Sequence, residues 1–513
     1  MNLFETLIAQ STDVDSLDQY LASNLHKVQD FYSRDFMYMI ESREIIEQYI
    51  NTKYGLFEQL DLEESYNRAF LLILLDISVR FNFIANAKRL CSILRKKSVE
   101  LPLRLQAACL YLENIDSNTT LLERFESICE SLQNAIEEEE KNPDKAIAIF
   151  LSYYAIVVRD THPHKKYINA LQSKIQTALE ERTFLFLHTE YVEKALDIDT
   201  GEGNAAYEEI HTIIDSLLCK APSRSVYSGK ETFIIEDGTP YASELVGVEA
   251  SFDQIRSISV SGSDGKADTK RGVGILETEQ QLMSYMRNLG LMHCAKLEAA
   301  FDTLPEDLPS NIRLIDWGCG RGIASMLFIE RYGSEQVKDI LLIEPSEVAL
   351  GRAALHLKKY DEDLAIRTVC AKLDELESSI FTIEKDDCVI HLFSNILDIE
   401  EYSQERLIEL IEETHTGNNY FICVSPHITG IEEERLNSFK RHFQQRYSDS
   451  FQLLSENTDT KYSPFWLCNE NKDCEEVTHG RGFYCRTDYT PIGGCRKKWT
   501  RVERVFSVRW FSV

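Results

Sequence analysis

The sequence DWGCGRG at residues 316–322 decides the fold of the second half of this chain. It follows an apolar run at 312–315 and opens an amphipathic stretch at 323–332. That order predicts a strand, a tight loop and a helix that ends at Gly333. Glycines at every second position let the backbone approach a ligand closely, and the positive end of the following helix favours polar or anionic ligand groups. The stretch therefore predicts a loop that binds a nucleotide cofactor.

An acidic residue after the next predicted strand supports the same interpretation. Residues 339–343 read as a strand and lead into Glu344, which lies 22 residues beyond Gly322. A ribose-binding acid lies at about that distance in a doubly wound sheet. NAD sites usually carry G-x-G-x-x-G, whereas here the glycines alternate and Asp316 precedes them. The pattern resembles the first motif of the class I S-adenosylmethionine-dependent methyltransferases, and the resemblance covers roughly residues 275–513.

The resemblance implies an α/β doubly wound, Rossmann-like domain with a seven-stranded sheet whose last strand is antiparallel. Strand-like runs do alternate with helix-like segments, and polar residues follow the strands. The further strands that we expect span residues 365–370, 388–393, 420–424, 451–454 and 502–510. A helix over 278–303 is expected to line the pocket. It carries Tyr285, Arg287 and His293 in position to meet the methionine carboxylate or the methyl acceptor.

The resemblance also implies a set of cofactor contacts at the carboxyl ends of the strands. Gly318 and Gly320 would border the methionine part, and Glu344 would hold the ribose hydroxyls. Residues 372–374 would flank the adenine, and residues 393–395 would lie nearest the transferable methyl group. The expected cofactor-binding residues are Asp316, Gly318, Cys319, Gly320, Gly322, Glu344, Lys372, Leu373, Asp374, Phe393 and Ser394.

The methyl acceptor is less well defined by the sequence. Amino-methylating DNA enzymes of the family carry Asn/Asp-Pro-Pro-aromatic after the fourth strand, whereas residues 394–397 read SNIL, which argues against that kind of base methylation. C5 methylation of pyrimidines needs a nucleophilic cysteine, and Cys388 and Cys423 lie inside predicted strands, where core packing is the simpler role. Methyl transfer needs alignment above all, and a base only where the acceptor must lose a proton. Our candidate catalytic residues are Asn395 and His427, the second of which is the candidate base.

A cluster of cysteines near the end of the chain suggests a metal site. Four of them fall within 28 residues: Cys468, Cys474, Cys485 and Cys495. Clustered thiolates bind zinc or an iron-sulfur cluster well, and His479 is a spare ligand. The cluster contains no C-x-x-C pair and matches no zinc template, so core cysteines are the alternative.

The region that carries these cysteines is locally basic in an acidic chain. Residues 460–513 hold ten Lys or Arg against six Asp or Glu, whereas the whole chain has a net charge of −29. Basic residues interleaved with aromatic ones can grip a phosphate backbone while the rings stack on bases, so we expect an RNA or protein acceptor to contact the basic insertion at 460–500. A solvated surface is the alternative. The total charge would repel free nucleic acid, which makes such binding local or partner-assisted.

The chain is long enough, at 513 residues, for more than one unit. Residues 1–220 contain few glycines and successive amphipathic stretches, which predict an α-helical domain, either a bundle or an irregular helical repeat. Residues 221–273 are rich in Ser, Gly and Thr and are expected to form a linker with short strands, at 233–235 and 257–260. Residues 274–513 would then form the methyltransferase-like domain.

The composition also bears on the compartment. No basic-then-apolar segment opens the chain, and the longest apolar run, at 69–75, is too short to cross a bilayer. We therefore expect a soluble cytoplasmic protein with no membrane partner. Thirteen cysteines, an odd number spread through a large acidic chain, favour reduced thiols over a disulfide framework.

Two functions of different classes follow from these features. The first is an S-adenosylmethionine-dependent methyltransferase that acts on RNA or protein. The second is a scaffold that binds the cofactor, or has lost it, and works through a protein partner of its helical N-terminal half.

Overall fold

The computed structural model describes most of the chain, in two compact units. The described residues are 3–34, 36–112, 117–138, 143–219, 240–262, 274–381, 388–427, 430–459, 466–467, 489–490, 494–495 and 498–511. The first unit comprises Met1–Arg224 with Ile428–Glu434, and the second comprises Ser225–His427 with Arg435–Val513. Within the described ranges, none of the helices combines the length and the hydropathy that a bilayer crossing needs.

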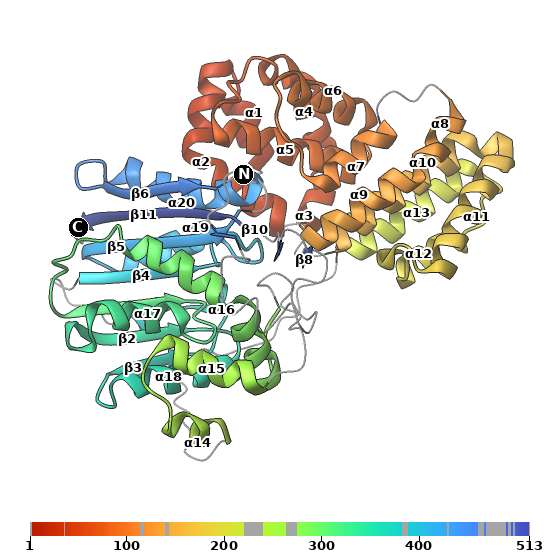
Figure 1. Ribbon diagram of the computed structural model, residues 1–513. Helices are drawn as coiled ribbons and strands as arrows, with labels where there is room; N and C mark the ends of the chain where they lie inside the picture. Colours follow the sequence, from red (N-terminus) through yellow and green to blue (C-terminus); the bar gives the residue numbers. More distant parts are fainter. Residues whose placement is uncertain are drawn as a thin grey trace. The chain divides into compact units, whose positions relative to one another are not determined.

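The first unit is helical, as the sequence predicts (Figure 1). Two of its helices, α5 and α10, bury nearly every side chain, and helices that are apolar on all sides belong in the middle of a protein core. One hydrophobic cluster extends through the unit from Phe4 to Leu217. Its helices are α1 (Leu3–Gln10), α2 (Val14–Arg34), α3 (Phe36–Glu41), α4 (Arg43–Phe57), α5 (Ser65–Arg80), α6 (Ile84–Lys96), α7 (Leu103–Leu112), α8 (Asn118–Glu123), α9 (Phe125–Glu138), α10 (Asp144–Thr161), α11 (Lys165–Glu181), α12 (Glu190–Leu196) and α13 (Gly203–Leu218).

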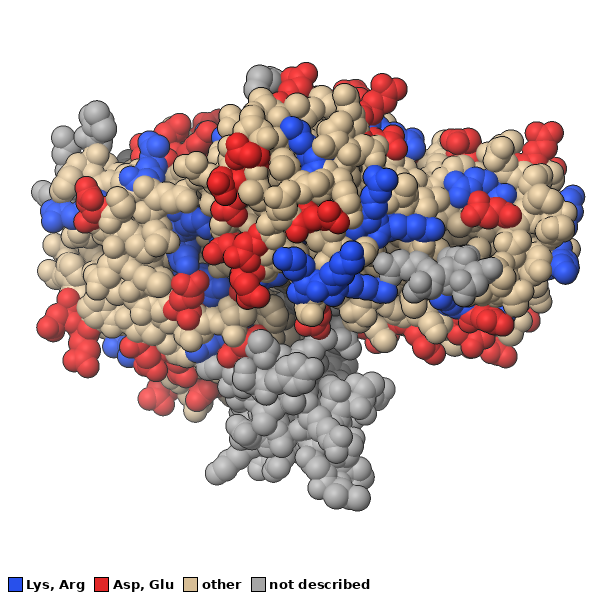
Figure 2. Space-filling model, turned by 90° about the horizontal axis from the view of Figure 1, so that it is seen from above, with Lys and Arg blue, Asp and Glu red and all other residues tan. Residues whose placement is uncertain are grey.

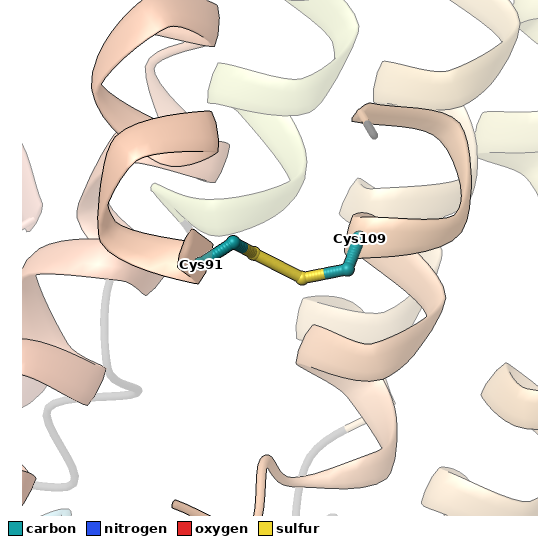
Figure 3. Close-up of a disulfide and its surroundings, with 2 residues drawn as sticks. All are labelled: Cys91 and Cys109. Atoms are coloured by element: carbon teal, nitrogen blue, oxygen red, sulfur yellow. A yellow bond between two sulfur atoms is a disulfide. The ribbon is translucent and has the colours of Figure 1, made fainter. Parts of the chain in front are cut away.

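A disulfide in this unit corrects the expectation that the thiols are reduced. Cys91 in α6 and Cys109 in α7 are joined, and Figure 3 shows their side chains pointing toward one another from two helices. The two residues are 18 apart in sequence and both are buried. The count of cysteines could not reveal this pair, because only the packing of α6 against α7 brings the two side chains together.

The second unit is built on a seven-stranded sheet. The strand order is β3-β2-β1-β4-β5-β11-β6, in which β11 pairs antiparallel with both of its neighbours and the other pairs are parallel. This confirms the predicted fold class, including the antiparallel last strand. The strands are β1 (Ile312–Trp317), β2 (Val337–Ile343), β3 (Ile366–Val369), β4 (Cys388–Ser394), β5 (Gly417–Pro426), β6 (Gln452–Thr458) and β11 (Arg501–Trp510).

Helices cover both faces of this sheet (Figure 1). Successive side chains of β1 point to opposite faces of the sheet, so Leu314 packs with α14–α18 while Ile315 packs with α19 and α20. The helices are α14 (Pro240–Val246), α15 (Phe252–Gly262), α16 (Glu279–Phe301), α17 (Ile323–Tyr332), α18 (Glu347–Tyr360), α19 (Gln404–Thr414) and α20 (Gly430–Arg446). The helix expected over 278–303 is confirmed as α16, which Thr278 and Gln281 begin with a capping box.

The expected linker with short strands at 221–273 is wrong for its described part. Residues 240–262 form α14 and α15, so residues 257–260 are helical rather than extended. The reason is a helical spacing of buried side chains, since Phe252, Ile255 and Ser259 lie on one face of α15 and pack against the second unit's core. Residues 233–235 lie outside the described residues.

The cysteine-bearing insertion falls mostly outside the described residues. Cys468, Cys474 and Cys485 are among the residues that the structure does not describe, and Cys495 is described only as backbone of a short strand. The short strands here are β7 (Trp466–Leu467), β8 (Tyr489–Thr490), β9 (Gly494–Cys495) and β10 (Lys498–Trp499), which pair as β10-β7 and β8-β9. In the described part of the chain, no group of three or more potential ligands could hold a metal ion.

Candidate functional site

The glycine loop between β1 and α17 forms the first part of the site. Gly318, Gly320 and Gly322 have φ angles of +66°, +52° and +73°, which L side chains rarely adopt. A Cβ on Gly318 would collide with the side chain of Ile396, whereas a Cβ on Gly320 would point into open space. Space above Gly320 is what a loop needs if a ligand is to lie against its backbone.

Two carboxyl groups flank this loop, of which Asp316 is buried and Glu344 is partly buried. Glu344, directly after β2, accepts hydrogen bonds from the backbone N–H groups of Gly320 (3.1 Å) and Ser346 (3.1 Å). Asp316, at the end of β1, accepts one from Ser325 Oγ (2.7 Å). Burial raises the pKa of Glu344 to about 7 and the pKa of Asp316 to about 6. The site therefore holds two acids that titrate near neutral pH.

Arg321 turns away from the loop and anchors it. Its buried guanidinium donates hydrogen bonds to Ser259 Oγ (3.1 Å), to the Leu282 carbonyl (2.6 Å) and to Tyr241 Oη (3.2 Å). These three partners lie on α15, α16 and α14. Arg321 thus fastens the loop to three helices, and its charge is used inside the protein rather than offered to a ligand.

A polar chain at the carboxyl end of β4 forms the second part of the site. Lys296 Nζ donates to Asn395 Oδ1 (2.5 Å), and the Asn395 amide nitrogen donates to His293 Nδ1 (2.8 Å). His293 Nε2 lies 2.7 Å from Tyr285 Oη. Because Nδ1 accepts, the proton of the neutral imidazole lies on Nε2 and is donated to Tyr285. All of these groups except Asn395 come from α16.

Burial controls the charges of this chain. It lowers the pKa of Lys296 to about 7 and the pKa of His293 well below its ordinary value, and it raises the pKa of Tyr285. Asn395 itself adopts a φ of +60°, and its N–H is held by the Val424 carbonyl (2.8 Å). A residue other than glycine in this conformation is uncommon and often lies at a functional site.

The order of the strands decides the fold of this unit. Numbered along the sheet, the order is 3-2-1-4-5-7-6 with an antiparallel seventh strand, the glycine loop follows strand 1, and the acid follows strand 2. The second unit has a class I methyltransferase fold.

Comparisons with known proteins give only distant likenesses. No protein-family model matches the chain, and no curated protein matches it. It is similar to the solved structure of TrmK from M. capricolum with S-adenosyl-homocysteine (10% identity, 42% of this chain and 69% of that one, TM-score 0.24). It is also similar to an rRNA methylase from Streptococcus thermophilus (12% identity, 42% and 97%, TM-score 0.24) and to phosphoethanolamine N-methyltransferase 2 from Haemonchus contortus (13% identity, 45% and 58%, TM-score 0.30). At TM-scores this low, the likenesses carry no weight of their own, and the strand order defines the fold.

The methyltransferase fold implies S-adenosylmethionine as a cofactor, and the residues at its strand ends fit that group. The backbone cradle at Gly320 is open, and Glu344 presents a carboxyl group beside it for ribose hydroxyls. Lys372, Leu373 and Asp374 follow β3, where a 3₁₀ turn (η5, Leu373–Glu375) begins. Within this turn the Asp374 side chain accepts a hydrogen bond from Ser403 N (2.9 Å) at the start of α19.

Other expected residues have less direct places in this fold. The ring of Phe393 is buried and stacks on Trp317 (5.5 Å between centroids), so its side chain belongs to the core, while Ser394 is only partly buried at the end of β4. Cys319 donates its N–H to the Ile343 carbonyl (2.9 Å), and burial raises the pKa of its thiol. Cys388 and Cys423 are buried in strands, as expected.

The two candidate catalytic residues are not joined to each other. The hydrogen bonds of Asn395 go to Lys296, His293 and Val424. His427 lies just beyond β5, where its backbone pairs with Thr500 (3.3 Å and 3.1 Å). The residue that sequence reasoning missed is Lys296. The signal was its spacing, because Tyr285, His293 and Lys296 fall on one face of a helix at positions i, i+8 and i+11.

Proposed function

We propose that the second unit binds S-adenosylmethionine and transfers its methyl group to a macromolecular acceptor, either RNA or protein. One observation carries the proposal. The glycine loop is held open over Gly320 by left-handed backbone geometry, and the partly buried carboxyl group of Glu344 is fixed to that same residue. A flexible turn would need neither the three positive φ angles nor an acid at its centre.

The residues of the site have separable tasks in this reaction. The bound cofactor supplies a methyl group on a sulfonium, which needs little chemical activation. Because the loop residues are glycines, no side chain of Gly320 occupies the space in which the ligand would lie. Glu344 would orient the ribose hydroxyls. Asn395, fixed by Lys296 and His293, holds the rim of the pocket at β4 rigid, so that an acceptor is aligned with the methyl group rather than activated.

The acceptor is chosen outside the cofactor pocket in this proposal. The basic insertion at 460–500 would contact RNA or an acidic protein surface, and the helical unit would bind a protein partner. The total charge of −29 disfavours free nucleic acid, so contact must depend on local basic surface. Figure 2 shows, on one face of the described part of the chain, that acidic side chains are common and that a group of Lys and Arg side chains separate from the insertion lies near the middle of the view.

The deciding experiment is calorimetric titration of the full chain with S-adenosylmethionine, S-adenosylhomocysteine and NAD. We expect micromolar binding of both sulfur compounds and none of NAD. Binding would justify a search for acceptors among RNA and protein. Failure to bind either sulfur compound would overturn the proposal and favour the scaffold function of the helical half.

A variant in the loop tests the pocket itself. Gly320→Asp places a carboxylate in the open space above the loop at a strained φ of +52°, so it should abolish binding of S-adenosylhomocysteine. Gly55→Asp is the matched control, because a Cβ at Gly55 also meets nothing within 4 Å but lies in α4 of the other unit. Unchanged affinity in Gly320→Asp would remove the pocket that we propose.

A further inference from the structure

Lys296 is a buried amine with too few partners for a charged group. Its side chain is 1% exposed, and its described hydrogen-bond partner is Asn395 Oδ1. An ammonium group carries three N–H donors, and a buried charge is costly unless an opposite charge is paired with it. Among the described residues, no ion pair joins this amine to a carboxylate. Asp398, in the loop after β4, favours the charged form only through its field.

The amine lies beside Asn395 at the carboxyl end of β4, where the amino-acid part of the cofactor would be expected. Along the edge of the sheet, residues 372–374 follow β3, Glu344 follows β2, the glycine loop follows β1 and Asn395 follows β4. A ligand held with its adenine at β3 and its ribose at Glu344 would extend its remaining atoms toward β1 and β4. Gly318 packs against Ile396, the neighbour of Asn395, so the loop and the Lys296 amine border the same end.

The other cation of the glycine motif cannot serve here. The Arg321 guanidinium donates hydrogen bonds to Ser259, Leu282 and Tyr241, on the side of the loop that faces α14–α16. His293 is neutral, because burial holds its pKa well below the ordinary value and its Nδ1 accepts a hydrogen bond. A carboxylate arriving between the loop and β4 would find the Lys296 amine beside Asn395 as a donor.

We propose that Lys296 binds the α-carboxylate of the cofactor's amino-acid part, and that the amine takes up a proton from solvent as the carboxylate arrives. This inference rests on the proposed cofactor binding and deepens it. Burial holds the pKa of Lys296 at about 7 in the free protein, and a contacting carboxylate returns this pKa toward its ordinary value. The protein thus keeps an uncharged amine in a dry site until its counter-ion is delivered.

Other titrating groups face the same space, and they set the pH of the test. His293 lies on the same helix, Asp398 favours the charged amine from the loop after β4, and Tyr285 lies within the electrostatic field of Glu344. Burial raises the pKa of Glu344 to about 7, so this group is mostly ionised at pH 8 and releases little proton there. At pH 8 the Lys296 amine is mostly neutral. Proton uptake at that pH that disappears in the Lys296 variants therefore reports Lys296.

The test is calorimetric titration of the full chain with S-adenosylhomocysteine at pH 8, in two buffers of different ionisation enthalpy. We expect nearly one proton to be taken up per ligand bound. Lys296→Arg, which is always charged, should bind without proton uptake. Lys296→Met should lose affinity at least tenfold and take up no proton. Lys194→Met, on the exposed side of α12, should behave as wild type.

A second ligand isolates the carboxylate. Wild type should bind the decarboxylated analogue of S-adenosylhomocysteine at least tenfold more weakly than the parent compound, and Lys296→Met should not distinguish the two. Ligand binding without proton uptake by wild type would overturn the inference and leave the proposed function standing, as would equal loss of both ligands in Lys296→Met. Absence of any binding by wild type would overturn both. Unfolding curves of each variant identify a loss of affinity that comes from misfolding.

Discussion

Replacing Glu344 by Gln should make the second unit more stable at pH 8 while weakening its hold on the cofactor. Burial raises the pKa of this carboxyl group from 4.5 to about 7. At about 1.4 kcal/mol per pKa unit, the ionised group costs the folded state about 3 kcal/mol at pH 8. Gln cannot accept hydrogen bonds on both sides, so it loses the bond from Gly320 or Ser346, at about 1 kcal/mol. The net expectation is a gain of about 2 kcal/mol at pH 8.

The size of the stability difference between Glu344→Gln and wild type depends on pH, which makes the prediction testable by comparing two pH values. The folded state binds the Glu344 proton more tightly than the unfolded state does, so its contribution to stability is complete below pH 4.5 and is lost as the pH rises to 7. Wild type and Glu344→Gln should therefore have nearly equal free energies of unfolding at pH 5 and diverge at pH 8.

Urea unfolding followed by tryptophan fluorescence measures the right unit. All four tryptophans of the chain, at 317, 466, 499 and 510, lie in the second unit, so their fluorescence does not report the helical unit. Glu306→Gln, at an exposed position of the same unit, is the control for the loss of one charge. A Glu344→Gln variant that is less stable than wild type at pH 8, or whose stability changes with pH in parallel with wild type, would refute the reasoning.

Three further changes have expected outcomes. Arg321→Met removes three buried hydrogen bonds, at about 1 kcal/mol each, and should destabilise the second unit by about 3 kcal/mol, measured by the same fluorescence. In the helical unit, burial opposes the charge of Asp76, but Arg104 and Arg80 hold the pKa of this carboxyl group well below its ordinary value. The stabilisation that the ionised Asp76 provides is therefore lost as the pH falls below 4. Asp76→Asn should lower the free energy of unfolding by about 3–5 kcal/mol, measured by far-UV circular dichroism. Cys91→Ser should cost about 3 kcal/mol through the 18-residue loop that the disulfide closes, and mass analysis showing both thiols free to alkylate in the unreduced protein would contradict the pairing.

The sheet and its loop were predictable because their signals are local. Buried parallel strands are short apolar runs in the sequence. The glycine loop directly follows β1, and the acidic residue Glu344 directly follows β2. The left-handed backbone at Gly318, Gly320 and Gly322 follows from the residue type itself. These features need no knowledge of what packs against them.

The remaining features depend on distant partners. Lys296 reads as an ordinary solvated lysine, and only the approach of Asn395, 99 residues later, reveals it as part of the site. The helix α15 is encoded among Ser and Gly residues, which favour loops, but its Phe252 and Ile255 are drawn into the core of the sheet. Tertiary burial overrode local propensity in both cases.

The anchoring of Arg321 also bears on how the second unit folds. Its partners Tyr241 and Ser259 precede it by 80 and 62 residues, so they leave the ribosome long before the guanidinium that binds them. Until residue 321 is made, α14 and α15 lack the group that fixes them. Closing such long loops costs conformational entropy, so we expect Arg321 to reach these two partners late in folding. A fragment that begins at residue 274 would contain the whole motif and still bury Arg321 without two of its partners.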